Sequence, residues 1–299
     1  MNLTKSLTFA LLSLLVVVAF AQQEFGTSFK DLPFSKIAVS HEVDTKCPPT
    51  GVSDGNTYHY AQNAAKNNFS AKGTPVALTI DDFSRLQNAT QKKIDQGEIA
   101  FKGKYPEDRS LLEKIIEVNG KWVGEGKLVT LDAYVFGADY ANTQYNKDSQ
   151  DRPGIGEAVN CNSPELAWND IHIALSSDVA PQADECGTVT AELSPHGRPA
   201  IWDRFHDGLN AEIETLLPGL LRQRVIRMQQ KGDELIYVRL TGPLFYDASH
   251  TPCKFDGKTV TERQSPPRRS IWEIHPVYRI QVRNESNQWI EFDEWAKGR

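Results

Sequence analysis

The stretch SIWEIHPVYRIQV, residues 270–282, has the composition of a β-strand but carries a histidine and a proline at its centre. Seven of its thirteen residues are β-branched or aromatic, which favours a strand. Large apolar residues occupy even positions on both sides of Pro276, so the alternation keeps its phase across the break. Proline donates no ladder hydrogen bond and is tolerated in strands at bulges and edges. We therefore interpret Pro276 as a bend in a strand that must turn sharply.

Four further strands are predicted upstream, at 127–139 (KLVTLDAYVFGAD), 158–177 (AVNC, a break, then NDIHIALSS), 187–195 (GTVTAELSP) and 235–247 (LIYVRLTGPLFYD). The intervening stretch 198–223 reads as mainly helical. Three strands, a helix and two strands is the order of the OB fold, whereas β-sandwiches rarely place one long helix there. The sequence therefore predicts a mainly β protein with an OB-fold-like five-stranded barrel over residues 121–283.

The barrel is flanked by an N-terminal arm, residues 22–120, and a C-terminal tail, residues 284–299. In the arm, residues 22–75 have turn and loop composition, and two helices are predicted at 78–94 and 106–118. Thr79 and Asp82 are spaced for a cap of the first helix, and Gly120 is expected to end the second. The tail is expected to pack on the barrel as a short strand or helix through its large aromatic residues.

Residues 1–21 resemble a secretory signal peptide. One lysine precedes a mostly apolar run from Leu7 to Phe20, and Ala19-Phe20-Ala21 supplies a cleavage pattern. The run is short for a membrane span, which needs roughly 20 residues, and no later run is longer. We expect a secreted or periplasmic protein without a transmembrane segment.

The charge balance argues against nucleic acid as a partner. Cleavage would remove Lys5 alone, leaving 32 basic against 39 acidic side chains, a net charge of −7. Such a chain has no global field that draws it to nucleic acid or an anionic membrane. A polar small molecule or a cell-envelope component is the expected partner, and the sequence does not identify a cofactor.

The four cysteines are Cys47, Cys161, Cys186 and Cys253, without a CxxC pair. Structural zinc sites usually contain such closely spaced ligands, so the spacing argues against zinc. In an oxidising compartment an even number predicts two disulfides, with three possible connectivities.

The second and third strands alternate strictly and turn Asp170, His172 and Glu192 to the same side of the sheet. OB barrels bind ligands over this face, within a rim formed by the loops after the first and fourth strands. His275 joins these residues if the last strand curls over the barrel, and Asp247 and His250 lie at the mouth of the final loop. These six residues are the ligand-binding candidates, with a metal ion possible at His172, Glu192 and His275. The alternative is that these residues have no ligand: Asp170, His172 and Glu192 would lie on an ordinary solvated strand face, and Asp247 and His250 in a turn that caps its own backbone.

The motifs NCNSPELAWNDIHIALS (160–176), VTAELSP (189–195), VRLTGPLFYDASH (238–250) and SIWEIHPVYRIQV (270–282) together resemble a family of uncharacterised exported bacterial proteins. KCPPTG (46–51) and AKNNF (65–69) resemble that family's N-terminal arm. The resemblance implies an OB-like domain and export, and carries no activity or catalytic residue. Cys186 and Cys253 depart from the family pattern, which implies that they pair with each other and Cys47 with Cys161.

Three classes of function remain open. The first is an OB-like binding protein whose ligand, an oligosaccharide, a peptide or a metal, lies on the second and third strands. The second is a metal-dependent or nuclease-like hydrolase using Asp170, His172, Glu192 and His275. Staphylococcal-type nucleases share the strand order, but Asp132 has no evident arginine partner in the following loop. The third is a structural envelope protein without a ligand.

Overall fold

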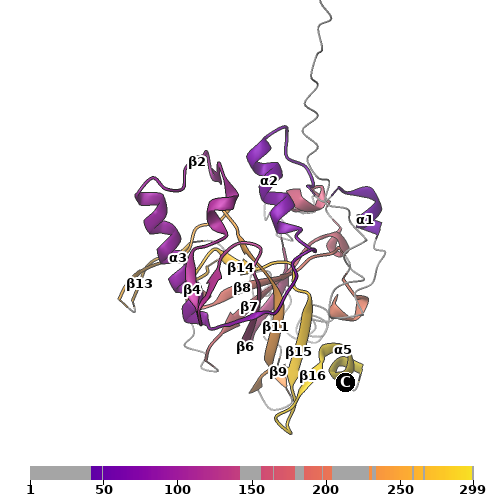
Figure 1. Cartoon of the computed structure of the whole chain (residues 1–299). Helices are drawn as coiled ribbons and strands as arrows, with labels where there is room; N and C mark the ends of the chain where they lie inside the picture. The colour runs from indigo at the N-terminus through magenta and orange to yellow at the C-terminus, as the bar shows by residue number, and fades with distance from the viewer. Residues whose placement is uncertain are drawn as a thin grey trace, which may run out of the picture.

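The computed structural model describes residues 42–141, 156–178, 185–203, 229–230 and 234–297, apart from residues 49, 164, 197, 258, 265 and 266. Within these ranges the chain forms a closed five-stranded β-barrel with N-terminal segments packed over one end (Figure 1). The predicted mainly β, OB-like barrel is confirmed. The signal-like segment, the rim loop around 142–155 and most of the predicted helix 198–223 lie outside the described residues.

The ring of hydrogen-bonded strands has the OB order. Its members are β6 (Leu128–Tyr140), β7 (Ile171–Ser176), β8 (Val189–Leu193), β14 (Trp272–Ile274) and β11 (Tyr237–Tyr246). β6 pairs antiparallel with both β7 and β11, which closes the barrel. β8 pairs antiparallel with β7 and parallel with β14, and β14 pairs antiparallel with β11. The alternation read from the sequence fills the interior, where Ile171, Ile173 and Leu175 are fully buried.

The last barrel strand is interrupted at Pro276, where the sequence predicts a bend. β14 ends with Ile274 opposite Leu244, and β15 (Arg279–Arg283) begins opposite Thr241. Residues 275–278 therefore face the two residues 242 and 243, a bulge that contains the cis His275–Pro276 bond. Inside the bulge the Val277 N–H donates to the Glu192 carbonyl at 2.9 Å. The strand thus bends at the break but stays hydrogen-bonded to β8.

Gly242 allows the bulge to approach β11 closely. A Cβ atom at this position would lie 2.4 Å from the Pro276 carbonyl oxygen and 2.7 Å from Ile274 Cγ2. Because the nearest contact is with backbone, no side-chain rotation relieves it.

We expect Gly242→Ala to lower the free energy of unfolding by about 1–3 kcal/mol, the usual effect of overpacking a buried site. Urea denaturation of both proteins measures the difference. Gly187→Ala is the matched control, because a Cβ there has no atom within 4 Å. Equal stability of the two variants would contradict the proposed steric requirement.

The first predicted helix of the arm is confirmed as α3 (Ile80–Asp95). The Thr79 hydroxyl accepts from the Asp82 N–H, and the Thr79 N–H donates to Asp82 Oδ2 at 2.9 Å, forming a capping box. Phe83 and Leu86 are fully buried on its inner face. Just before this helix, β1 (Val76–Leu78) pairs in parallel with β6, so the arm extends the barrel's sheet.

The second predicted helix, at 106–118, is wrong. This stretch contains a 3₁₀ turn, Arg109–Leu112, and the strand β4 (Ile116–Val118), which pairs antiparallel with β5 (Lys121–Val123). Asn119 and Gly120 both have positive φ, 51° and 72°, which is the conformation that a two-residue hairpin loop requires. Gly120 therefore closes a hairpin rather than a helix. The AVNC segment is also corrected, since Ala158–Asn160 forms a 3₁₀ turn and not a strand.

Two helices lie in the region expected to be turns and loops, α1 (Glu42–Lys46) and α2 (Thr57–Lys66). The Asn56 side chain caps α2 by accepting from the Tyr58 and His59 N–H groups. The residues that α2 buries include Gln62, Asn63 and Lys66, so the helix has no clear apolar stripe. This polar inner face explains why periodicity did not reveal it.

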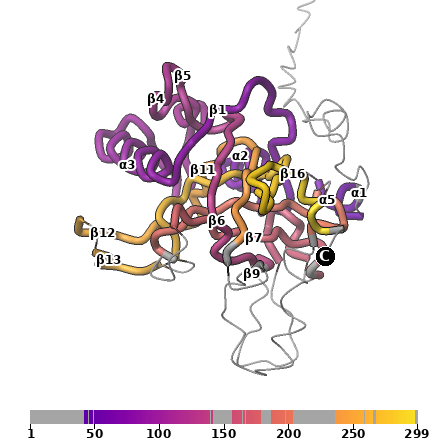
Figure 2. Tube along the Cα trace, turned by 90° about the horizontal axis from the view of Figure 1, so that it is seen from below, coloured from indigo at the N-terminus to yellow at the C-terminus, as the bar shows by residue number. Residues whose placement is uncertain are grey.

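The remaining elements are short and lie around the barrel. The tail forms both a strand and a helix, β16 (Trp289–Glu291), which pairs with β15, and α5 (Phe292–Lys297). The β12–β13 hairpin extends away from the barrel (Figure 2). The small paired strands are β2 (Phe101–Lys102), β3 (Tyr105–Pro106), β9 (Gln229–Gln230), β10 (Glu234–Leu235), β12 (Lys254–Asp256) and β13 (Thr259–Glu262). Among the described residues, no helix has the length and apolarity needed to cross a membrane.

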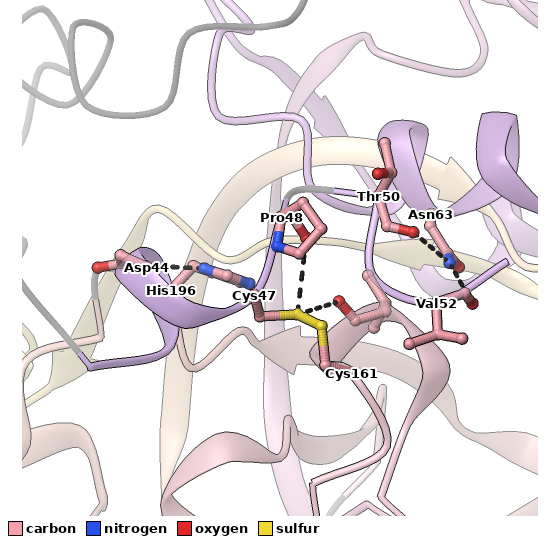
Figure 3. The surroundings of a disulfide bond; sticks show 9 residues. Asp44, Cys47, Pro48, Thr50, Val52, Asn63, Cys161 and His196 are labelled. Atoms are coloured by element: carbon pink, nitrogen blue, oxygen red, sulfur yellow. Dashed lines mark hydrogen bonds and ion pairs between the residues drawn. A yellow bond between two sulfur atoms is a disulfide. The ribbon is translucent and has the colours of Figure 1, made fainter.

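All four cysteines are disulfide-bonded, Cys47 to Cys161 and Cys186 to Cys253, the pairing that the family resemblance implies. The Cys47–Cys161 bond joins the arm to the segment before β7 across 114 residues (Figure 3). In the same region Asn63 Nδ2 donates to the Thr50 carbonyl at 2.8 Å, and His196 Nδ1 lies 2.7 Å from Asp44 Oδ1. The first contact is internal to the arm, whereas the disulfide and the His196–Asp44 contact join the arm to the barrel.

We expect thiol titration of the unreduced, denatured protein to detect no free thiol. Replacing Cys47 and Cys161 together by serine is expected to lower the free energy of unfolding by about 2–5 kcal/mol, because a long loop is no longer closed in the unfolded chain. Chemical denaturation with and without reductant checks this. Detection of four thiols in the unreduced protein would contradict both assigned bonds.

Candidate functional site

The face of the barrel that carries the predicted ligand residues is covered by the arm. Asp170 and Glu192 have fully buried side chains, and the His172 side chain is 25% exposed. Helix α2 lies over them and contributes Lys66, whose side chain is 8% exposed. The open, solvated strand face that was the plain alternative is therefore wrong for this part of the sheet.

Lys66 brings its ammonium group into the middle of three carboxylates. Its Nζ atom lies 2.8 Å from Glu157 Oε1, 2.9 Å from Glu192 Oε2 and 3.3 Å from Asp170 Oδ2. Burial alone would lower the pKa of Lys66, but the three carboxylates outweigh it and raise the pKa well above its usual value. Lys66 is therefore positively charged and partly neutralises the cluster of acidic side chains formed by Glu157, Asp170 and Glu192.

Glu192 is the residue shared by both halves of the cluster. Its Oε2 atom faces Lys66 and His275, whereas its Oε1 atom lies 3.0 Å from His172 Nε2. His172 and Glu192 are directly opposed on β7 and β8, which accounts for the short distance. Burial would raise the pKa of Glu192, but His172 and Lys66 hold it well below its usual range.

His275 connects the bulge of the last strand to the arm and the cluster. Its Nδ1 atom lies 2.5 Å from the Lys66 carbonyl, which can accept but not donate, so Nδ1 carries a proton. Its Nε2 atom lies 3.2 Å from both Asp170 Oδ2 and Glu192 Oε2. Against the effect of burial, these two carboxylates raise the pKa of His275 to about 9. The ring is thus held as an imidazolium. The histidine beside Pro276 is therefore a contact between the bulge, the Lys66 carbonyl and two buried carboxylates.

His172 faces the outer side of the cluster. Besides Glu192, its Nε2 atom has Glu157 Oε1 at 3.9 Å. The other oxygen of Glu157 accepts from the Asp170 N–H at 3.2 Å and from Asn160 Nδ2 at 3.4 Å, which fixes the carboxylate. Burial would lower the pKa of His172, but Glu192 and Glu157 raise it well above its usual value.

The other two candidates belong to the same cluster: Asp247 lies on its inner side with a buried side chain, whereas the His250 side chain is 26% exposed. His250 Nε2 is 3.6 Å from Asp247 Oδ2, and Gln62 Nε2 donates to Asp247 Oδ1 at 3.0 Å. Burial and the charge of Arg268 lower the pKa of His250 to about 4, so this ring is neutral at pH 7. Burial would raise the pKa of Asp247, but His250 and Lys66 lower it.

Glu273 and Arg268 complete the inner side and form a fully buried ion pair. Burial and the neighbouring Glu192 raise the pKa of Glu273 well above its usual value, against the effect of Arg268. All six sequence candidates therefore belong to one cluster. The cluster also contains Lys66, Glu157, Glu273 and Arg268, which the sequence did not single out.

Three sets of ligand atoms in this cluster lie within 4.8 Å of one another, and each could hold a metal ion. The sets are Glu157, His172 and Glu192; Asp170, Glu192 and His275; and Glu192, Asp247 and Glu273. Lys66 contacts two carboxylates of the second set and also Glu157 of the first, and Arg268 binds Glu273 in the third. The first set differs from the other two because it includes a partly exposed ligand, His172. His172 and His275 approach opposite oxygens of Glu192, so the expected ligand set of His172, Glu192 and His275 is divided between two positions.

The resemblance contained one signal for the missed lysine, because Lys66 is the lysine of the AKNNF motif. Glu273 likewise lies in the quoted last strand, two residues before His275. Nothing in the local pattern marks Glu157, which directly follows the rim loop.

The sequence shows no evident arginine partner for Asp132 in the following loop, of which residues 142–155 lie outside the described residues; the structure pairs Asp132 with Arg239 on the neighbouring strand. Arg239 Nε and Nη2 donate to its two oxygens at 2.7 Å each. This arginine comes from β11 and not from the loop after β6, so the pair does not form the nuclease-like arrangement.

Comparisons with known proteins yield no relative: no family model matches the chain, and no curated protein or solved structure is significantly similar to it. The resemblance to the exported bacterial family therefore stays a prediction.

We expect Lys66→Met to lower the free energy of unfolding by about 3–5 kcal/mol, because it leaves buried carboxylates without their cation. Urea denaturation at neutral pH measures this loss. Lys93→Met is the matched control, since the Lys93–Glu98 pair is partly exposed and such pairs contribute about 0–1 kcal/mol. Similar losses in the two variants would show that Lys66 is not the cation on which the cluster depends.

Proposed function

We propose that this is an exported OB-like binding protein that holds a divalent metal ion between Glu157, His172 and Glu192. The observation that carries the proposal is the convergence of ligand atoms from these three residues, with His172 Nε2 3.0 Å from Glu192 Oε1 and 3.9 Å from Glu157 Oε1. Export is supported by the signal-like sequence and by two disulfides, which persist in oxidising compartments.

The distances support a shared ion. Ligand atoms bound at roughly 2 Å to a tetrahedral ion lie roughly 3.3 Å apart. The separations here are 3.0 Å between His172 Nε2 and Glu192 Oε1, and 3.9 Å between His172 Nε2 and Glu157 Oε1. Small side-chain shifts would therefore make room for the ion.

The charge balance also supports a cation. Five buried carboxylates, those of Glu157, Asp170, Glu192, Asp247 and Glu273, face two permanent cations, Lys66 and Arg268. Without metal, protonation of His172 and His275, whose pKa values are raised by these carboxylates, offsets part of the deficit. A dication bound to neutral His172 would replace part of this protonation.

The two oxygens of Glu192 would have different roles. Oε1 would bind the ion, while Lys66 and His275 hold Oε2 and orient the carboxylate, as partners of metal ligands commonly do. One imidazole and two carboxylates suit zinc and similar transition-metal ions better than calcium or magnesium, which prefer oxygen ligands. The partial exposure of His172 gives the ion a route to solvent.

Stability alone is a weak explanation for such a cluster, because replacing buried ion pairs by apolar residues of equal volume is often neutral or stabilising. A role in binding accounts for why ten polar and charged side chains converge here.

The test is titration of the chelator-treated protein with ZnCl₂, followed by calorimetry and thermal unfolding. We expect one ion per chain and an increase in melting temperature, since a ligand selective for the folded state stabilises it. His172→Ala is expected to abolish the response and Glu157→Gln to weaken it, with MgCl₂ giving no effect.

His59→Ala is the matched control, because His59 is a partly buried histidine stacked on Tyr105, outside the cluster. Its zinc response should equal that of the wild type. If the folded wild-type protein shows no zinc-dependent stabilisation, or if His59→Ala loses the response as well, the proposed site is wrong and the cluster is structural.

A further inference from the structure

An aromatic ladder crosses the outer face of the barrel, away from the acidic cluster. It consists of Tyr134 on β6, Tyr237 on β11 and Trp289 on β16, all half-buried. Tyr134 and Tyr237 are cross-strand partners with ring centroids 4.6 Å apart. The Tyr237 ring stacks on Trp289 at 5.7 Å with an interplanar angle of 29°. Three aromatic surfaces therefore follow one another across the sheet.

Two arginines frame this ladder. Arg239 lies over the Trp289 ring at 4.4 Å, and Arg283 lies 5.6 Å from the Tyr237 centroid and 6.0 Å from the Trp289 centroid. Such contacts hold the rings and the guanidinium groups in fixed relative positions. The ladder is thus ordered before any ligand arrives, which reduces the entropy lost on binding.

The two arginines differ in their charge balance. Arg239 is neutralised by its bidentate contact with Asp132. Arg283 has no ion pair with a described carboxylate, and its Nε atom is buried without a hydrogen-bond partner. Within the part of the chain that the structure describes, the face therefore presents one guanidinium without an ion pair, beside stacked rings.

Carboxylate and amide groups lie on the same face. Gln281 is the cross-strand partner of both Arg239 and Glu291, and Asp132 is the partner of Arg239 on the other side. Their oxygens can accept hydrogen bonds from hydroxyl groups, and the amide can also donate. Half-exposed aromatic rings flanked by such groups suit a ligand with apolar ring faces and many hydroxyls.

From this arrangement we infer that the ladder of Tyr134, Tyr237 and Trp289 binds an acidic oligosaccharide, with a sugar carboxylate on Arg283. Sugar rings would lie on the aromatic faces, and their hydroxyls would bond with Gln281 and the flanking carboxylates. Arg283 can bind a carboxylate through two parallel hydrogen bonds. This site is separate from the proposed metal site and does not depend on it.

Single-stranded nucleic acid also stacks on aromatic platforms, but it requires a groove of several cations for its phosphates. Among the described residues of this face one arginine, Arg283, has no ion pair, which suits a single carboxylate and not a series of phosphate groups. The charge pattern therefore favours the oligosaccharide.

The test measures binding of tetragalacturonate, an acidic tetrasaccharide, to the full mature protein in the presence of EDTA, by calorimetry and tryptophan fluorescence. Cellotetraose is the neutral comparison and oligo(dT) the nucleic-acid comparison. We expect tetragalacturonate to bind most tightly, and Trp289→Ala and Tyr237→Ala each to weaken it by about tenfold or more. Arg283→Gln should remove the preference for the acidic over the neutral sugar.

Trp122→Ala is the matched control, since Trp122 is 53% exposed on the β4–β5 hairpin and lies outside the ladder. It should bind tetragalacturonate like the wild type. Circular dichroism verifies folding. If Trp289→Ala does not fold, the sugar preference of Arg283→Gln is the deciding measurement.

The inference is overturned if the wild type binds no tetragalacturonate, or if Trp122→Ala weakens binding while the ladder variants do not. Tighter binding of oligo(dT), lost on substitution of the ladder, would assign the surface to nucleic acid instead. Because EDTA is present throughout, the result is independent of whether zinc binds.

Discussion

The position of helix α2 depends on one interaction, the contact of the Lys66 ammonium group with the carboxylates of Glu157, Asp170 and Glu192. A buried carboxylate without a cation is strongly unfavourable, so the strands that carry these acids require a partner from elsewhere in the chain. Helix α2 supplies it, and its buried side is accordingly polar. The contacts that place α2 on the barrel are therefore largely polar and charged, whereas the following part of the arm packs through apolar residues such as Phe83 and Leu86.

This constraint changes what the second and third barrel strands can do. In OB barrels that face is the usual place for oligonucleotides and oligosaccharides. Here the chain's own helix occupies it, and the fully buried Asp170, Glu192 and His275 leave no open surface for a large ligand. A small cation at the half-exposed His172 is compatible with this cover. The outer face of β6, β11 and β16 carries the half-buried aromatic residues to which we assign the larger ligand.

The barrel could be predicted from the sequence because its strands alternate, and alternation assigns each residue to a face. The same reasoning placed Asp170, His172 and Glu192 together, since β7 and β8 are adjacent in the OB order. Residues 106–118 were misread because short apolar runs such as Leu112, Ile115 and Ile116 fit a helix and a strand equally. Lys66 and Glu157 could not be placed, because neither lies in a periodic segment. Their contacts depend on the docking of the arm, which no local pattern specifies.

The precision that the cluster requires explains why the arm is fixed on both sides of Lys66. On the N-terminal side, the Cys47–Cys161 bond ends four residues after Glu157, so it joins the arm to the segment that carries a partner of the lysine. On the C-terminal side, the Tyr278 hydroxyl bonds to the backbone of Asn68 and Ala71. Tyr278 belongs to the same bulge as His275, whose ring contacts the Lys66 carbonyl. The bend at Pro276 thus serves two purposes, because it turns the last barrel strand and brings two side chains to the arm. Ion pairs in a buried site are favourable only with accurate geometry. The disulfide and the bulge together restrict α2 to the position in which that geometry is met.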